Sequence, residues 1–158
     1  MARYLIDPER STVWIDATSS VHPIHSESTG LEGWFEEPSG HLELAVDRLK
    51  SGNPLLDREM KRRIDARHYP KISGDLTGME AEADGRYKAR GEITFRGVTR
   101  AVDGELTVTM SDDDTVRITG ERVFDIRDFD FEPPRILMLR VHPEVSVRID
   151  VVATKGRP

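Results

Sequence analysis

The chain has 158 residues, enough for one ordinary domain, and 37% of them are hydrophobic. It contains no Cys, which excludes a disulfide framework, a thiolate zinc site and a cysteine nucleophile. Its 29 acidic and 23 basic residues give a net charge of −6. This balance argues against nucleic-acid binding, because non-specific affinity for phosphate chains comes from surplus Lys and Arg.

The sequence contains no recognisable membrane or export signal. No run approaches the roughly 18 to 20 apolar residues of a transmembrane helix. The opening residues 1–12 lack the basic, apolar and small-residue zones of a signal peptide. We therefore expect a cytoplasmic protein that forms a single domain over residues 1–158.

Most of the chain alternates apolar and polar residues with the period of two that is typical of half-buried β-strands. The alternation first occurs in residues 11–20 and returns in residues 41–47. It continues through residues 86–96, 98–110 and 116–124 and ends in residues 145–153. The sequence therefore predicts an all-β protein.

The connections favour antiparallel pairing because they are short and rich in turn formers, as in residues 38–40, 84–85 and 112–114. Parallel strands would need crossovers of a dozen or more residues, and the chain has room for only one helix. Seven or eight strands with one short α-helix fit a closed or nearly closed antiparallel barrel. The periodicity alone also fits a sandwich.

The one predicted helix covers residues 57–67. Asp57 is a suitable N-cap, and Pro70 prevents the helix from continuing. One face carries apolar residues at intervals of four, namely Leu56, Met60 and Ile64. The basic cluster at residues 61–63 is either a solvated helix face or a patch for phosphate or anionic lipid.

Small residues recur at inward positions of the predicted strands. A barrel of about eight strands has an interior just wide enough to be filled by side chains or to hold one small ligand. Small residues there indicate either a cavity or sharply bent strands, since glycine permits bending. The residues are Ala17, Gly33, Ala89, Gly91, Gly104 and Gly120.

The pair His22 and His25 is the most suggestive of a ligand site among the five histidines. Positions three apart on a regular strand point to opposite faces. A shared metal would therefore need a bulge at Pro23 and a third ligand such as His41. The simpler interpretation places both histidines at a strand end or in a loop, and we predict no metal and no cofactor.

Two charged segments have simple structural interpretations. Residues 112–114 lack the spacing and distal Glu of a calcium loop and predict a solvated hairpin tip. In residues 124–131, strand alternation would send the Phe rings to one side and an ion-pair group of Asp125, Arg127 and Asp128 to the other. An aromatic core with external charges explains this segment as well as ligand contact does.

No motif for nucleophilic catalysis or phosphate binding is present. The chain has no G-x-S-x-G elbow, no Walker pattern and no G-x-G-x-x-G loop. Acid–base catalysis stays open because Asp and Glu are abundant, but they form no recognisable arrangement.

Four stretches that span nearly the whole chain together resemble the YceI-like family. They are YLIDPERSTV (4–13), SGNPLLDREMKRRIDARHYPKI (51–72), GEITFRGVTRAV (91–102) and ERVFDIRDFDF (121–131). The third is the most specific, and Gly33 with Phe35 fits the G-x-F of the family. The resemblance implies an extended, lipocalin-like antiparallel β-barrel that binds a polyisoprenoid or a related amphipathic lipid.

Three departures from the family pattern affect the expected pocket. Gly74 stands where the family often has an aromatic residue, Asp130 replaces a Gly, and residues 22–29 are more polar than a typical second strand. With these departures, a ligand shorter or more polar than a long isoprenoid also fits the sequence.

The resemblance implies that lumen residues supply the affinity, with the lipid head group near the mouth of the barrel. The helix and its exit would cover one opening with Met60, Ile64 and Tyr69. Trp14 has the opposite parity and is expected outside. By strand parity, the lumen residues expected to contact ligand are Val13, Ile15, Phe35, Leu42, Leu44, Phe95, Val108 and Phe124.

Two functions from different classes follow. The first is non-enzymatic binding, sequestration or transport of an isoprenoid-type or other long-chain lipid. The alternative is a small barrel isomerase or hydrolase that acts on an apolar substrate through His22, His25 or a nearby carboxylate. We expect no nucleic-acid partner, and homodimerisation through exposed strand edges stays open.

Overall fold

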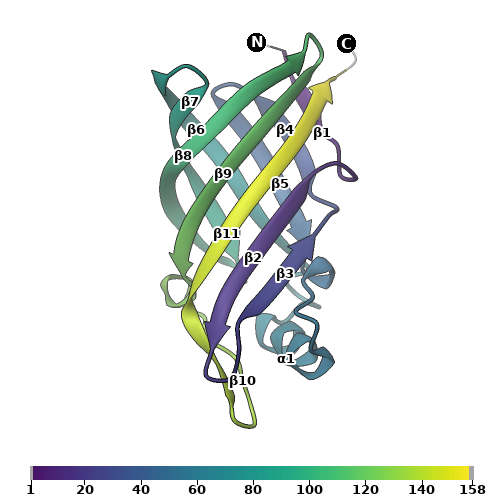
Figure 1. Ribbon diagram of the computed structural model, residues 1–158, viewed down its shortest axis with the longest axis vertical. Helices are drawn as coiled ribbons and strands as arrows, with labels where there is room; N and C mark the ends of the chain where they lie inside the picture. The colour runs from purple at the N-terminus through teal and green to yellow at the C-terminus, as the bar shows by residue number, and fades with distance from the viewer. Residues whose placement is uncertain (1, 157–158) are drawn as a thin grey trace.

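The chain folds into a closed antiparallel β-barrel in the computed structural model, which describes residues 2–156 (Figure 1). The strands are β1 (Tyr4–Ile6), β2 (Thr12–Ser19), β3 (Ile24–Ser28), β4 (Glu32–Glu36), β5 (Ser39–Ala45), β6 (Lys71–Ala83), β7 (Arg86–Phe95), β8 (Val98–Asp112), β9 (Thr115–Asp125), β10 (Arg135–Ile136) and β11 (Leu139–Lys155). The helical segments are η1 (Val46–Arg48), α1 (Pro54–Ile64) and η2 (Ile126–Phe129).

The barrel closes through the circuit β1-β4-β5-β6-β7-β8-β9-β11 and back to β1. The long strand β11 pairs with β1 near its C-terminal end and with β2 along most of its remaining length. Strand β3 pairs with β2 and ends the path of strands. The predicted antiparallel barrel of about eight strands with one short α-helix is confirmed. The sandwich is excluded because the sheet returns on itself.

Strand alternation creates a packed core at the barrel end where both chain termini lie (Figure 1). Val116 pairs with Ala153, and Ile118 pairs with Val151, on β9 and β11. All four are buried, whereas Arg117 between them is exposed. One inward face of each strand is therefore enough to fill this end of the barrel.

The three predicted hairpins are confirmed, but the turns predicted at residues 38–40 and 112–114 have different bounds. Residues 37–38 join β4 to β5, residues 84–85 join β6 to β7, and residues 113–114 join β8 to β9. A further hairpin between β7 and β8 was not predicted. Its turn residues Arg96 and Gly97 have φ values of 53° and 76°, which suit the tight primed turns of β-hairpins.

Helix α1 begins at Pro54 rather than at residue 57, so the predicted boundaries are wrong. The cap is Asn53, whose side-chain oxygen accepts hydrogen bonds from the backbone N–H groups of Leu55 and Leu56. Pro54 fits the first turn because its missing N–H would have no intrahelical partner there. The helix ends at Ile64 since Asp65 adopts a left-handed conformation with φ of 59°.

The predicted apolar face of the helix is confirmed in its packing. Leu56 packs with Leu139 and Val141 of β11, while Ile64 packs with Val46 and Phe131. The loop before the helix runs along β3, where the Ser28 hydroxyl donates to the Arg48 carbonyl over 2.8 Å. Helix α1 thus covers the barrel end opposite the chain termini (Figure 1).

The basic cluster on α1 is paired with nearby carboxylates. Arg62 and Arg63 lie 2.6 and 2.8 Å from Glu59, and Lys61 lies 3.6 Å from Asp47. Hydrogen bonds from Arg62 and then Arg63 lower the pKa of Glu59 to about 2. These pairs favour the interpretation as a solvated helix face. Within residues 2–156, no helix has the length and apolar character needed to cross a membrane.

Residues 124–131 do not continue as the predicted strand, because η2 interrupts them. Phe129 and Phe131 pack edge-on against Phe95, with ring centroids 6.2 and 5.1 Å away. Asp125 and Arg127 form a 2.7 Å ion pair. The carboxylate of Asp128 does not join that pair. Its backbone carbonyl instead accepts a hydrogen bond from the Arg100 side chain. Aromatic and charged groups separate as expected, but through a helical turn rather than strand alternation.

Candidate functional site

The barrel encloses an apolar cavity of about 470 Å³. This volume lies within the range of roughly 300–1,000 Å³ that is typical of ligand pockets. Inward-facing side chains of several strands form its walls. They include Ile15, Leu42, Leu44, Leu76, Phe95, Leu106, Ile118, Phe124, Val147 and Ile149.

Most of the residues selected from the sequence line this cavity. They are Val13, Ile15, Phe35, Leu42, Leu44, Met60, Phe95 and Phe124. Three lie outside the lining. Val108 packs on the core near the chain termini, and Ile64 is buried beneath α1. Tyr69 is 40% exposed and lies against the β7–β8 turn at Gly97.

The small inward residues have two different explanations. Ala17, Ala89, Gly91, Gly104 and Gly120 line the cavity, whereas Gly33 does not. A Cβ at Gly104 would meet only the Arg122 side chain, at 3.6 Å, so this position leaves open space. A Cβ at Gly91 would lie 2.2 Å from the Asp75 carbonyl oxygen. That glycine is required by the close approach of β6 and β7.

The two ends of the cavity differ. Tyr4, Val116 and Ala153 are buried beyond the lining and close the end that carries the chain termini. At the helix end the lining includes Lys50, Ser51 and Asp57, and Ser51 donates a 2.7 Å hydrogen bond to the carboxylate of Asp57. The helix end therefore offers polar groups to a ligand whose tail fills the lumen.

The barrel wall has a seam between β8 and β9. These strands pair from Leu106–Gly120 to Asp112–Thr115, but within the described chain no pairing joins residues 98–105 to residues 121–125. Those parts of the strands pair only with β7 and β11, respectively. Below the seam, the Arg100 guanidinium donates to the Asp128 carbonyl of η2 over 2.8 Å. The seam thus ends at the Leu106–Gly120 pair on one side and at η2 on the other.

Arg122 lies at this seam and belongs to the cavity lining. Its guanidinium carbon is 4.7 Å from the centre of the Phe124 ring, and a nitrogen of that group is 3.6 Å from the Asp103 carboxylate. Arg122 has the same strand parity as Gly120 and Phe124, both of which were expected to face inward, but it was not selected as a site residue. The signal that could have identified Arg122 from the sequence was a charged residue at an inward-facing position of a strand.

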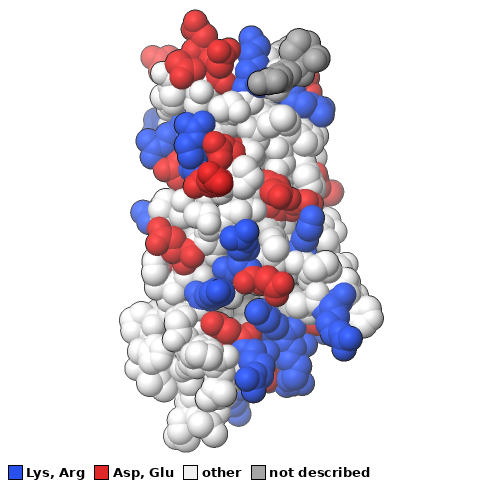
Figure 2. Space-filling view, turned by 90° about the vertical axis from the view of Figure 1, so that its right-hand side faces the viewer, with Lys and Arg blue, Asp and Glu red and all other residues white. Residues whose placement is uncertain are grey.

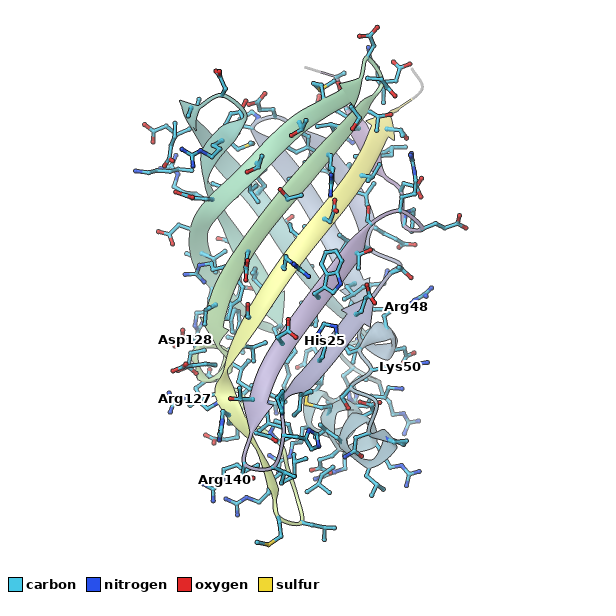
Figure 3. The ribbon with its side chains drawn as sticks, in the orientation of Figure 1. His25, Arg48, Lys50, Arg127, Asp128 and Arg140 are labelled. Carbon is cyan, nitrogen blue, oxygen red and sulfur yellow. The ribbon has the colours of Figure 1, made fainter. Side chains whose placement is uncertain are left out.

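The histidines proposed for metal binding or catalysis face away from the lumen. His25 bonds to Asp16 on the outer face of the β2–β3 pair, while its neighbours Ile24 and Ser26 line the cavity (Figure 3). The His22 ring lies 2.8 Å from the Pro23 carbonyl oxygen. Among residues 2–156, no group of three His, Cys, Asp or Glu side chains could hold a metal ion.

His41, the suggested third metal ligand, belongs to an ionic cluster on the outer face of β5 and β6. Its ring nitrogens lie 2.7 Å from Asp75 and 3.4 Å from Glu43. The hydrogen bond with Asp75 raises the pKa of His41, with Glu43 as a further cause. A 2.8 Å bond from Lys71 lowers the pKa of Glu43. These contacts describe a structural ion-pair cluster.

A closed eight-stranded barrel around an apolar cavity, covered at one end by a helix, defines a lipocalin-like class of ligand-binding protein. The chain belongs to the YceI-like domain family, whose sequence profile matches residues 4–153. Comparison with curated proteins finds no match.

Solved structures share the fold at low sequence identity. A polyisoprenoid binding domain from Saccharophagus degradans, implicated in plant cell wall breakdown, has a TM-score of 0.83 and 12% identity. That alignment covers 99% of this chain and 100% of the other. BcnA from Burkholderia cenocepacia has a TM-score of 0.79 and 17% identity, with 94% and 99% covered. The Campylobacter jejuni YCEI protein has a TM-score of 0.64 and 15% identity, with 77% and 75% covered.

Proposed function

We propose that this protein binds, sequesters or transports a polyisoprenoid or similar amphipathic lipid in the barrel cavity, without catalysing a reaction. The apolar cavity of about 470 Å³ carries the proposal. Membership of the YceI-like family and the shared fold with a polyisoprenoid binding domain support lipid as the ligand.

The lining supplies the affinity through apolar burial. Each 100 Å² of apolar ligand surface removed from water contributes about 2.5 kcal/mol before the costs of association. In this proposal the ligand tail contacts the eight lining residues selected from the sequence. These are Val13, Ile15, Phe35, Leu42, Leu44, Met60, Phe95 and Phe124.

The enzymatic alternative finds no support in the positions of its proposed groups. It required His22, His25 or a nearby carboxylate to converge inside the lumen, within hydrogen-bond reach of a substrate. Both histidines lie on the outside, where His25 bonds to Asp16 and His22 lies against a backbone carbonyl. The lumen therefore receives no histidine of the proposed pair, and Asp57 in its lining is hydrogen-bonded to Ser51.

Extraction of the purified protein with organic solvent, followed by mass spectrometry, tests the proposal directly. We expect a long-chain lipid in the extract, and uptake of prenols or quinones by protein stripped of lipid. The absence of both bound lipid and uptake would contradict lipid binding.

A lumen-filling variant tests where the lipid binds. We expect Gly104→Leu to fold and to lose at least about tenfold in lipid affinity, because the new side chain occupies open cavity space. Ala101→Leu is the matched control, since Ala101 is an exposed residue on the same strand. Equal lipid affinity of the two variants, measured by titration, would place the ligand elsewhere.

A further inference from the structure

The hairpin between β10 and β11 projects beyond the barrel at the helix end (Figure 1). Its two turn residues, Leu137 and Met138, are 89% and 86% exposed. They are the two most exposed large hydrophobic residues among those described. A projecting pair of large apolar side chains is unusual on a protein surface and marks an interaction site when it belongs to a larger patch.

The patch extends to the neighbouring β2–β3 connection. Ser20 accepts a hydrogen bond from the Arg140 backbone N–H over 2.9 Å, and its hydroxyl lies 2.9 Å from the Met138 carbonyl oxygen. These contacts hold Val21, which is 59% exposed, beside the hairpin. We call Val21, Leu137 and Met138 the apolar tip.

Turn chemistry does not explain the residues of this tip. Ile136 pairs with Leu139, so Leu137 and Met138 are the two central residues of a tight hairpin. Leu137 has a φ of +52°, a conformation in which glycine is strongly preferred at this position. A leucine there costs backbone strain, and such strain is characteristic of functional positions.

The surroundings of the tip are rich in cations. The connections at this end, residues 20–23, 46–70, 96–97 and 126–138, contain ten Lys or Arg and seven Asp or Glu. In the whole chain the balance is reversed, with 23 Lys or Arg and 29 Asp or Glu. The turns at the opposite end, residues 37–38, 84–85 and 113–114, contain four acidic residues and no basic one. The connections at the helix end therefore carry a net positive charge, against the overall charge of −6.

Two arginines beside the tip, and Lys50 in the cavity lining at the same end, have no ion-pair partner among the described residues. Arg135 and Arg140 lie directly opposite each other on β10 and β11, an arrangement of like charges that destabilises a strand pair. Neither Arg135, Arg140 nor Lys50 forms an ion pair with a carboxylate within the described chain. Figure 3 shows Arg140 and Lys50 at the helix end, and Figure 2 shows blue side chains beside an uncharged area there.

We propose that this end of the barrel docks on an anionic lipid membrane, with the apolar tip inserted among the head groups. Leu137 and Met138 would enter the acyl boundary, and Arg135, Arg140 and Lys50 would bind lipid phosphates. The same end carries the polar cavity residues Lys50, Ser51 and Asp57. Docking would therefore bring the cavity next to the bilayer.

A membrane fits these features better than a protein partner. The tip is convex and aliphatic, and Arg135 and Arg140 lie directly beside it on β10 and β11. Protein interfaces place their anchor residues in close-packed, desolvated centres, whereas this tip projects from the barrel into solvent. A second copy of this chain would place Arg135 and Arg140 against the same cations, so charge opposes self-association through the tip.

Vesicle sedimentation tests the docking surface, with lipid-loaded and with stripped protein, so that the result does not depend on the cavity being filled. We expect binding to vesicles of phosphatidylcholine mixed with phosphatidylglycerol, weaker binding to phosphatidylcholine alone, and loss of the difference at high salt. Leu137→Gly with Met138→Ser should lose at least about tenfold in affinity for the mixed vesicles.

A melting measurement on the tip variant and two further proteins make the test specific. The tip variant should melt at or above the temperature of the original protein, because glycine suits the positive φ. Arg135→Thr with Arg140→Thr should also bind about tenfold more weakly and respond less to salt. Met110→Ser, which removes an exposed hydrophobic residue near the opposite end, should bind unchanged.

Three outcomes would overturn the proposal. They are no preference for anionic vesicles, undiminished binding by the tip variant, and a dimer in light scattering that the tip variant abolishes while vesicles are not bound. Lipid uptake by protein that ignores vesicles would overturn the docking surface and leave the lipid-binding function standing.

Discussion

The ionic cluster at His41 shows how one residue on the outer face of the barrel makes stability depend on pH. His41 bonds to Asp75 and lies near Glu43, and these contacts raise its pKa above 6.5. A histidine whose pKa is higher in the folded state stabilises the fold fully below its unfolded pKa. This contribution is lost as the pH rises through the folded pKa.

We therefore expect His41→Gln to be less stable than the original protein below pH 6.5 and to approach it as the pH rises. Urea unfolding at several pH values would measure the difference in the free energy of unfolding. The effect is modest because the cluster is partly solvated. His22→Gln, which removes a histidine from outside the cluster, is the control. A difference for His41→Gln that grows with pH would contradict the sign.

Parity predicted the side of the strand for individual residues but not their height in the barrel. Val108 has inward parity, yet it packs on the core near the chain termini rather than on the cavity. The same alternation of apolar and polar residues occurs along a packed part of the barrel and along a part that encloses a cavity. Gly104 and Gly91 illustrate the same limit, because only their neighbours in the structure show that Gly104 leaves space and that Gly91 avoids a clash with β6.

Helix α1 shows what sequence patterns decide at the level of an element. The apolar face was predicted from intervals of four, but the start of the helix was placed three residues too late. Asp57 was chosen, whereas Asn53 is the cap and Pro54 occupies the first turn. Asp57 instead accepts hydrogen bonds from the backbone N–H and hydroxyl of Ser51. The Asn-Pro pair was the available signal for the true start.

The cap predicts a measurable contribution to stability. Asn53→Ala should lower the free energy of unfolding by about 1 kcal/mol, because the N–H groups of Leu55 and Leu56 lose their acceptor. Asn53→Asp should stay close to the original protein, since a carboxylate oxygen can accept the same bonds. Urea unfolding would compare the three proteins. Equal losses for Ala and Asp would show that another group caps α1.

The closure of the barrel is a property of the whole molecule that alternation left undecided. Closure depends on β11 pairing with both β1 and β9, three segments that are far apart in the chain. Hairpin turns could be read locally, but these pairings could not. The resemblance to the YceI-like family implied a barrel but not these particular pairings, and neither kind of inference predicted the seam between β8 and β9. The face of the sheet on which a residue lies follows from its local strand pattern. A gap in the barrel wall depends on the pairing of strands that can be distant in the chain.

The seam leads to a prediction about ligand exchange. Arg122 crosses it, with its side chain between Gly104 and Asp103 on β8 and Phe124 on β9. Arg122→Ala would widen the gap in the part of the wall where, among the described residues, β8 and β9 do not pair. We expect an uncharged fluorescent prenol to bind and dissociate severalfold faster in stopped-flow measurements, with little change in Kd, because an opening lowers the barrier in both directions.

Arg117→Ala is the matched control. Arg117 lies on the same strand but outside the barrel, in the paired region where it bonds to Asp150. Unchanged rates in Arg122→Ala would mean that the ligand passes through the helix end instead, and equal acceleration in both variants would trace the effect to general loosening of β9.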